Sequence, residues 1–166
     1  MVIWLTGLQG SGKTTISKAL MKALRDKRKN VVILDGDQIR DALGNFEYDV
    51  NSRKLLSRTY AKLSEFISQQ DTFVICATVS MFHSVREWNR ENIKDYYEIY
   101  VKTPPHILKK RNQKSLLSQA SQSQIKYVHG FDIEIEEPKY PDLIIENDGA
   151  HSIDSLVKHI LKEMNL

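Results

Sequence analysis

The chain has 166 residues, 41% hydrophobic and 27% charged, which fits a globular protein with one core. Its 24 basic and 21 acidic residues give a formal net charge of +3, too weak a bias to indicate a nucleic-acid partner. No apolar run approaches the ~20 residues that span a bilayer, and the N-terminus lacks signal-peptide features. We therefore expect a cytoplasmic protein with no membrane partner. Its single cysteine, Cys76, excludes a disulfide framework and is expected in the core.

Patterns typical of strands and helices alternate along the chain. In order, they predict a strand at 2–6, a helix at 13–28, a strand at 31–34, a helix at 52–69, a strand at 73–77, a helix at 85–94, a strand at 97–101, a helix opened by Pro104, a strand at 143–145 and a helix at 153–164 capped by Ser152. Buried strands separated by helices predict an α/β fold, a five-stranded parallel sheet with helices on both faces. In the helix at 52–69, the side chains expected to face the core are Leu55, Leu56, Leu63, Phe66 and Ile67.

Residues Gly7–Thr14 match the pattern G-x-x-x-x-G-K-T between the first predicted strand and helix. Such a loop binds phosphates through backbone N–H groups, while Lys13 reaches the β- and γ-phosphates of ATP and the Thr14 hydroxyl ligates Mg²⁺. Motif and context together favour a nucleotide site over a glycine-rich turn without a ligand. The candidate nucleotide-binding residues in the loop are Gly7, Gln9, Gly10, Ser11, Gly12, Lys13, Thr14 and Thr15.

The class of P-loop protein follows from what the sequence lacks. It contains no Asn-Lys-x-Asp motif, which GTPases use to read guanine, and it is short for a motor ATPase. These features favour a P-loop kinase that phosphorylates a small molecule.

Two aspartates follow the second predicted strand, in the turn Asp35-Gly36-Asp37. Ligands of open α/β sheets bind beyond the carboxyl ends of the strands, so both carboxylates are expected to face the phosphate loop. Phosphate transfer to a hydroxyl needs a carboxylate to accept the proton and acids to hold Mg²⁺ through water. We favour Asp35 as the base and Asp37 as its partner at the metal. The alternative is that Asp37 only caps a following helix.

These motifs resemble the adenylylsulfate kinase family, whose members phosphorylate the ribose 3′-hydroxyl of adenosine 5′-phosphosulfate. The resemblance runs over most of the chain. The segments that carry it are Gly7–Thr15, Leu34–Arg40, Arg53, Ala77–Ser80, Tyr100-Val101, Gly130–Asp132, Glu137-Pro138 and Pro141–Leu143.

The resemblance implies further site residues by position. Arg40 and Arg53 would hold the anionic group of the acceptor, a role that suits the planar, permanently charged guanidinium; alternatively, they form surface salt bridges. Lys114 would be a catalytic lysine of the lid, and Arg111 would lie near the base of ATP. The full set of implied acceptor contacts is Arg40, Tyr48, Arg53, Val79, Ser80, Lys114 and Tyr127.

The departures from the family lie on the acceptor side. Leu56 replaces a polar acceptor contact, and Val128 replaces a stacking aromatic unless Tyr127 takes its place. Losing one of two stacking aromatics would weaken adenine binding by ~1–3 kcal/mol. The lid motif is also altered after Lys114, and Met81 replaces the proline of a turn.

A branch similar to the adenylylsulfate kinases acts on cytidine diphosphoramidate in capsule biosynthesis, and a smaller pyrimidine suits the altered pocket. The expected acceptor is therefore a small nucleotide with a 5′ anionic tail. Cytidine diphosphoramidate is favoured, and adenosine 5′-phosphosulfate is the alternative.

The organisation of the chain is expected to be simple. Residues 1–166 are read as a single kinase domain, with a polar lid and acceptor loop at about 112–137, and a homodimer is a candidate assembly. A non-catalytic nucleotide-binding module is the alternative of another class. Retention of Lys13, Thr14, Asp35 and Asp37 together favours an enzyme.

Overall fold

The computed structural model describes residues 1–44, 47, 49–111 and 135–166. Its strands form one sheet in the order β2-β3-β1-β4-β5, and every neighbouring pair is parallel. The strands are β1 (Val2–Thr6), β2 (Val31–Asp35), β3 (Phe73–Ala77), β4 (Tyr96–Lys102) and β5 (Leu143–Glu146). The predicted five-stranded parallel sheet is confirmed. β1 and β3 have the predicted bounds, and β2, β4 and β5 exceed theirs by no more than one residue at an end.

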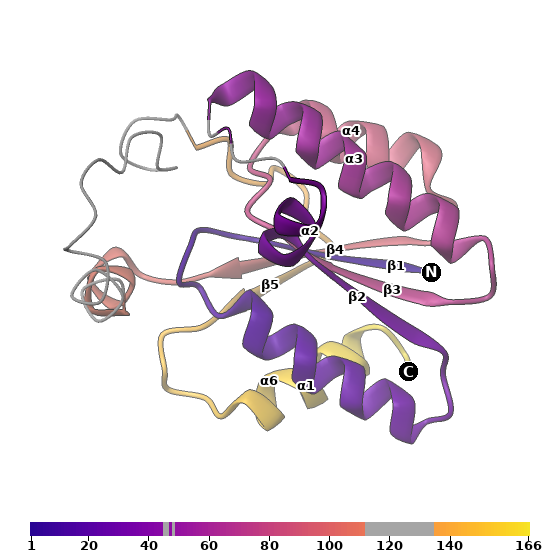
Figure 1. Cartoon of the computed structure of the whole chain (residues 1–166). Helices are drawn as coiled ribbons and strands as arrows, with labels where there is room; N and C mark the ends of the chain where they lie inside the picture. The colour runs from indigo at the N-terminus through magenta and orange to yellow at the C-terminus, as the bar shows by residue number, and fades with distance from the viewer. Residues whose placement is uncertain (45–46, 48, 112–134) are drawn as a thin grey trace.

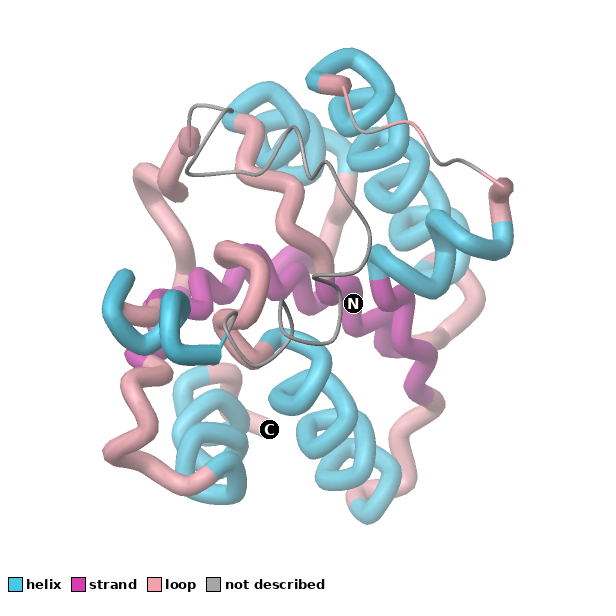
Figure 2. Tube along the Cα trace, turned by 60° about the vertical axis from the view of Figure 1, so that its left-hand side comes forward, coloured by secondary structure: helices cyan, strands magenta, loops and turns pink. Residues whose placement is uncertain are grey.

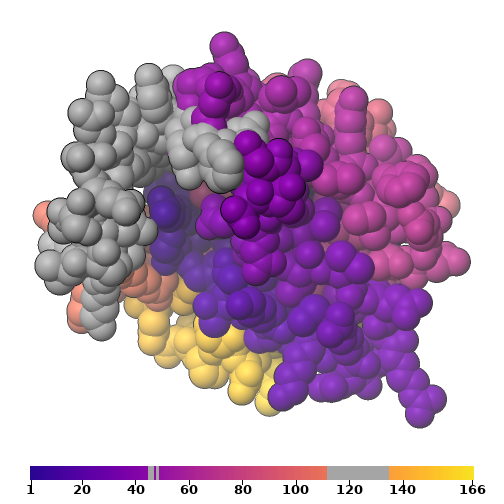
Figure 3. Space-filling model, in the orientation of Figure 1, coloured from indigo at the N-terminus to yellow at the C-terminus, as the bar shows by residue number. Residues whose placement is uncertain are grey.

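Helices cover both faces of the sheet (Figure 1). On one face lie α1 (Lys13–Asp26) and α6 (Ile153–Glu163); on the other lie α3 (Val50–Ser68) and α4 (His83–Asn92). Figure 2 shows the sheet as a single layer between the two helical layers. In the space-filling view, α1 and the C-terminal residues form the lower surface together (Figure 3). None of the described helices is long and apolar enough to cross a bilayer.

Two helical segments stand apart from these layers. The short α2 (Gly36–Ala42) directly follows β2 and was expected only as an alternative, a helix capped by the acidic turn. The helix opened by Pro104 is present at 105–111. The Pro104 carbonyl accepts hydrogen bonds from the N–H groups of Ile107 and Leu108, as a helix start requires.

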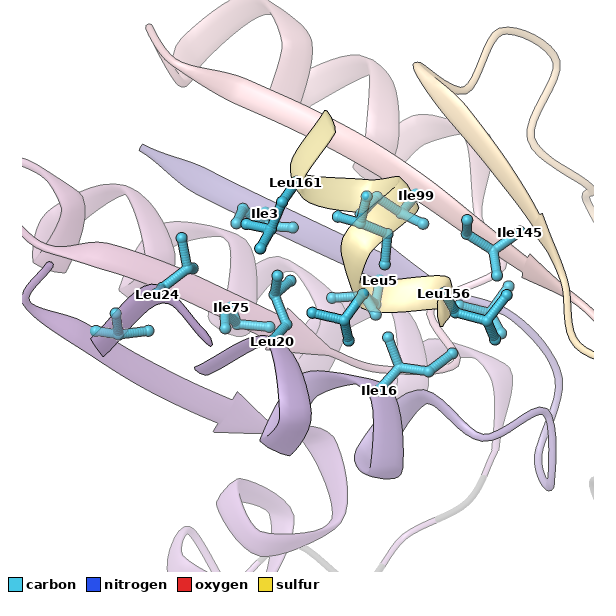
Figure 4. Packing of buried hydrophobic residues seen from close by; sticks show 14 residues of the cluster. Ile3, Leu5, Ile16, Leu20, Leu24, Ile75, Ile99, Ile145, Leu156 and Leu161 are labelled. Carbon is cyan, nitrogen blue, oxygen red and sulfur yellow. The ribbon is translucent and has the colours of Figure 1, made fainter. Parts of the chain in front are cut away.

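The core has two parts, one on each face of the sheet, because successive strand residues point to opposite sides. On β1, Ile3 and Leu5 pack against α1 and α6, whereas Val2 and Trp4 pack against α3 and α4. Figure 4 shows the first part, with leucines and isoleucines of α1 and α6 meeting those of the strands. Cys76 is fully buried in the second part, as predicted.

The core-facing side of α3 was predicted only in part. Leu56 is buried, but Leu55 and Phe66 are 66% and 63% exposed, so their predicted core positions are wrong. At 100° per residue these two lie opposite the stripe that packs on the sheet. The buried residues of that stripe are Leu56, Ser57, Tyr60, Ala61 and Ser64. Leu63 and Ile67 are partly buried against the same cluster, as predicted. Small and hydroxyl side chains also occupy the stripe, so apolar character alone did not separate it from the exposed positions of Leu55 and Phe66.

A buried ion cluster joins α4 to β4. The carboxylate of Glu98, on β4, lies 3.5 Å from Arg86 Nε and 3.1 Å from an Arg90 terminal nitrogen. Arg90 also pairs with Asp142 at 3.2 Å, and Asp142 accepts the backbone N–H of Glu98 at 2.7 Å. The cluster therefore fixes the segment that leads into β5 against α4.

Glu98→Ala is expected to destabilise the fold by about 3–5 kcal/mol, because it leaves two arginines without their shared buried carboxylate. The control is Glu163→Ala, which removes the exposed partner of His159 on α6 and should change stability by less than about 0.5 kcal/mol. Urea unfolding of the two variants and the wild type measures both effects. Similar stabilities for the two variants would contradict a structural role for the cluster.

Candidate active site

The phosphate loop joins β1 to α1, and its last glycine has a conformation that only glycine adopts easily. Gly12 has φ 96°, and a Cβ there would lie 2.4 Å from Nδ2 of Asn147. Helix α1 starts at Lys13 without a side-chain cap and without an acidic residue in its first turn. Its first N–H groups therefore point out of the helix end, where they can meet an anion.

Lys13 is held inside the loop. Its ammonium donates to the carbonyl oxygens of Gly7 and Leu8, both at 2.9 Å, and lies 3.5 Å from the Ser11 hydroxyl. Burial lowers the pKa of Lys13 to about 8, although the charges of Asp37 and Asp35 oppose this shift. The negative charges of the acidic turn thus act on the ammonium.

A side-chain hydrogen bond connects the phosphate loop to the acidic turn. The Thr14 hydroxyl donates to Oδ2 of Asp35 at 2.9 Å. The other oxygen, Oδ1, accepts the backbone N–H groups of Asp37 at 3.2 Å and Gln38 at 3.4 Å. Asp35, only 8% exposed, is thus the N-cap of α2. The capping role that we weighed for Asp37 belongs to Asp35, while Asp37 is exposed in the first turn of α2.

The turn after β3 lies beside β1. The Thr6 hydroxyl donates to the carbonyl of Val79 at 2.7 Å, and Arg86 donates to the carbonyl of Ser80 at 3.3 Å. Ser80 is a buried residue with φ 25°, and its hydroxyl has no hydrogen-bond partner among the described residues. Arg86 also donates to the carbonyl of Glu136 at 2.6 Å, so one guanidinium holds this turn and the segment before β5.

Some of the remaining predicted site residues lie in the described part of the chain, and others lie outside it. Arg111 donates to the carbonyl of Gly10 at 3.2 Å, which places its guanidinium against the phosphate loop. Arg40 lies on α2 and donates to the carbonyl of Glu47 at 2.8 Å, and Arg53 lies near the start of α3. The residues that lie outside the described part of the chain are Tyr48, Lys114, Tyr127 and Val128.

Asn147 is a loop-supporting residue that sequence reasoning missed. Its side-chain amide donates to the carbonyl of Ser11 at 2.7 Å, and its own carbonyl accepts from Thr103 at 3.2 Å and Arg111 at 3.3 Å. Its position could have identified it, because a polar residue directly after β5 lies at the same edge of the sheet as the phosphate loop.

The arrangement fits both ATP and Mg²⁺ chemically. The tight glycine loop, the uncapped start of α1 and Lys13 match the backbone and charge that triphosphates need. No group of three or more histidine, cysteine or acidic residues within the described ranges forms a metal cage. Mg²⁺ in kinases keeps several waters and takes few protein ligands beside the phosphates. The adjacent oxygens of Thr14 and Asp35 suit that requirement.

Comparison with known proteins decides the family. The sequence profile described as adenylylsulphate kinase matches residues 1–146. The chain belongs to the adenylylsulfate kinase family. A cytidine diphosphoramidate kinase from Campylobacter jejuni is 42% identical over 165 residues, covering 99% of this chain and 96% of that protein. An adenylyl-sulfate kinase from Bacillus velezensis is 37% identical, covering 88% of this chain and 76% of that protein.

A solved structure has the same fold. The adenylylsulfate kinase of Mycobacterium tuberculosis, in complex with AMPPNP and APS, superposes with a TM-score of 0.88 at 24% identity, covering 99% of this chain and 97% of that one. The predicted P-loop kinase fold is therefore confirmed. As a member of the adenylylsulfate kinase family, the chain is an ATP-dependent phosphotransferase, and the predicted enzyme class is confirmed over the non-catalytic alternative.

Lys13 gives this adenylylsulfate kinase family member a measurable pH dependence. Its pKa is lower in the folded state than in the unfolded chain, so the unfolded chain binds more protons between pH 8 and 10.5. Relative to Lys13→Met, the nucleotide-free wild type should gain up to about 3 kcal/mol of stability as pH rises through this range. Lys18→Met, an exposed change on the same helix, is the control in urea unfolding. A wild type that loses stability relative to Lys13→Met over this range would contradict the assignment.

Proposed function

We propose that the chain transfers the γ-phosphate of ATP to the ribose 3′-hydroxyl of a small nucleotide with a 5′ anionic tail. The favoured acceptor is cytidine diphosphoramidate, as used in capsule phosphoramidate biosynthesis. The observation that carries the proposal is the hydrogen bond between Thr14 and Asp35, because it brings the phosphate loop and the acidic turn into one site. The name and high identity of the Campylobacter relative support the acceptor.

On the donor side, the loop N–H groups and Lys13 bind the triphosphate of ATP. The Lys13 ammonium, now bonded to the carbonyls of Gly7 and Leu8, exchanges these partners for phosphate oxygens when ATP binds. Its charge then stabilises the negative charge that develops on the transferred group. Thr14 and Asp35 would hold Mg²⁺, which would supply positive charge to neutralise the phosphates.

The hydrogen bonds at the acidic turn favour roles for Asp35 and Asp37 that are the reverse of those expected from the sequence. Both oxygens of Asp35 are engaged, one with Thr14 and the other with the start of α2, which suits a fixed group beside the metal. Asp37 is exposed in the first turn of α2, which suits a base that accepts the proton of the acceptor hydroxyl. We therefore propose Asp37 as the general base.

On the acceptor side, Arg40 on α2 and Arg53 on α3 are proposed to hold the anionic tail. Leu56, which replaces a polar contact of the resembling enzymes, is buried in the apolar cluster between α3 and the sheet and offers no hydrogen bond. This change leaves the tail contacts in place and alters the side that would read the base. The preference for cytidine over adenine rests on this difference.

Several further expectations complete the proposal. Residues 1–166 are proposed to act as one kinase domain, with 112–137 forming the lid and acceptor loop that contains Lys114 and Tyr127. We propose Lys114 as a lid lysine near the transferred phosphate and Arg111 as a contact of the ATP base. The proposed setting is the cytoplasm, with a small nucleotide as partner, no nucleic acid or membrane, and a homodimer as the candidate assembly.

The aspartates are tested by two asparagine variants, which keep the size of the side chain. Asp37→Asn should lower kcat by roughly 10²–10⁴-fold with little change in ATP binding, because a general base is lost. Asp35→Asn should still cap α2, since asparagine caps as well as aspartate, but should raise the Mg²⁺ concentration needed for half-maximal rate. Steady-state kinetics over a Mg²⁺ series measures both. An active Asp37→Asn enzyme would reject the base assignment.

The acceptor is tested by direct competition. We expect kcat/KM for cytidine diphosphoramidate to exceed that for adenosine 5′-phosphosulfate by more than ~10-fold, which corresponds to ~1.4 kcal/mol of differential binding. Phosphorus NMR should place the new phosphate on the ribose 3′-oxygen. A preference for adenosine 5′-phosphosulfate would make the chain an adenylylsulfate kinase, the alternative supported by the Bacillus relative. Phosphate on another oxygen would refute the positional assignments.

A further inference from the structure

A buried phenol contacts the acidic turn from α3. The hydroxyl of Tyr60 donates to the carbonyl oxygen of Gly36 at 2.6 Å. Tyr60 is 3% exposed and packs in the core cluster between α3 and the sheet. The Gly36 carbonyl belongs to the peptide bond that leads into Asp37. The phenol therefore bonds to the backbone between the two aspartates.

This contact matters because α2 has few other anchors. The helix has seven residues, and none of them is buried. Ile39 is the residue of α2 that packs, partly buried, against the cluster around Tyr60. An isolated helix of this length is unstable, so its position depends on contacts at its start. Those contacts are the Asp35 cap and the hydrogen bond from Tyr60.

The Gly36 turn is confined from a second direction. A Cβ on Gly36 would lie 3.1 Å from the Thr78 hydroxyl, directly after β3. The turn is thus closely packed against the end of β3, while Tyr60 holds its carbonyl from α3. Helix α2 carries Asp37 and Arg40 on this fixed start.

We propose that Tyr60 is a positioning residue, whose hydroxyl fixes the start of α2 and thereby sets the places of Asp37 and Arg40 at the acceptor. The proposal rests on the proposed function, in which these two residues meet the acceptor. Burial raises the pKa of Tyr60, so the phenol keeps its proton and remains a donor at neutral and moderately alkaline pH. Because Tyr60 is buried in the core, it would act through the Gly36 backbone and not by direct contact with a nucleotide.

Tyr60→Phe tests the proposal, since it removes one oxygen and keeps the buried ring. With the nucleotide acceptor that the wild type uses better, kcat should fall on the order of tenfold, as expected for one lost positioning hydrogen bond. KM for ATP should change less than about twofold, because the phosphate loop is untouched. The matched control is Ser64→Ala, which removes a buried hydroxyl one turn further along α3, bonded to the Tyr60 carbonyl at 2.7 Å.

Hydrogen exchange provides a readout that does not depend on the acceptor. In the nucleotide-free protein, Tyr60→Phe should raise the exchange rates of amides in residues 37–42 by several-fold relative to those of α1, and Ser64→Ala should not. Unchanged exchange in α2, or a variant that loses thermal stability while keeping wild-type kcat, would overturn the proposal. If the wild type phosphorylates neither acceptor, the proposed function fails, and the exchange rates alone decide whether Tyr60 fixes α2.

Discussion

The site depends on one carboxylate that serves two helices. One oxygen of Asp35 accepts the hydroxyl of Thr14, in the first turn of α1, and the other accepts N–H groups at the start of α2. Since Asp35 is also the last residue of β2, it ties the sheet, the phosphate loop and the acidic turn together. Asparagine could keep the cap, but only a carboxylate places a negative charge beside the loop lysine.

Buried polar contacts extend this arrangement around the edge of the sheet. The Lys13 ammonium is compensated by loop carbonyls, and Asn147 and Arg111 bind the outer carbonyls of the same loop. Arg86 donates in the same way to the carbonyls of Ser80, in the turn after β3, and of Glu136, before β5. Unpaired buried polar groups would be costly, so these contacts stabilise the positions of the phosphate loop and of the turn after β3.

The sequence predicted the fold well because apolar runs and a complete phosphate motif leave little ambiguity. Its failures had local physical causes. Leu55 and Phe66 were assigned to the core by their apolar character, although serines and Tyr60 contribute to the packed stripe of α3 in their place. The bond from Tyr60 to Gly36 spans 24 positions and follows no motif. Similarly, the sequence did not show that Asp35 caps α2 and that Asp37 lies in its first turn. That assignment depends on where β2 ends, and periodicity does not resolve the end of a strand to one residue.

The contact between Asn147 and Ser11 joins residues 136 positions apart, and it has a consequence for biogenesis. A chain emerging from the ribosome presents its phosphate motif early, yet the strand that delivers Asn147 appears only after most of the polypeptide has been made. Until then the carbonyl of Ser11 lacks its amide donor, and the sheet lacks its last strand. The complete support of the phosphate loop therefore forms only late in synthesis, after β5 and Asn147 have joined the sheet.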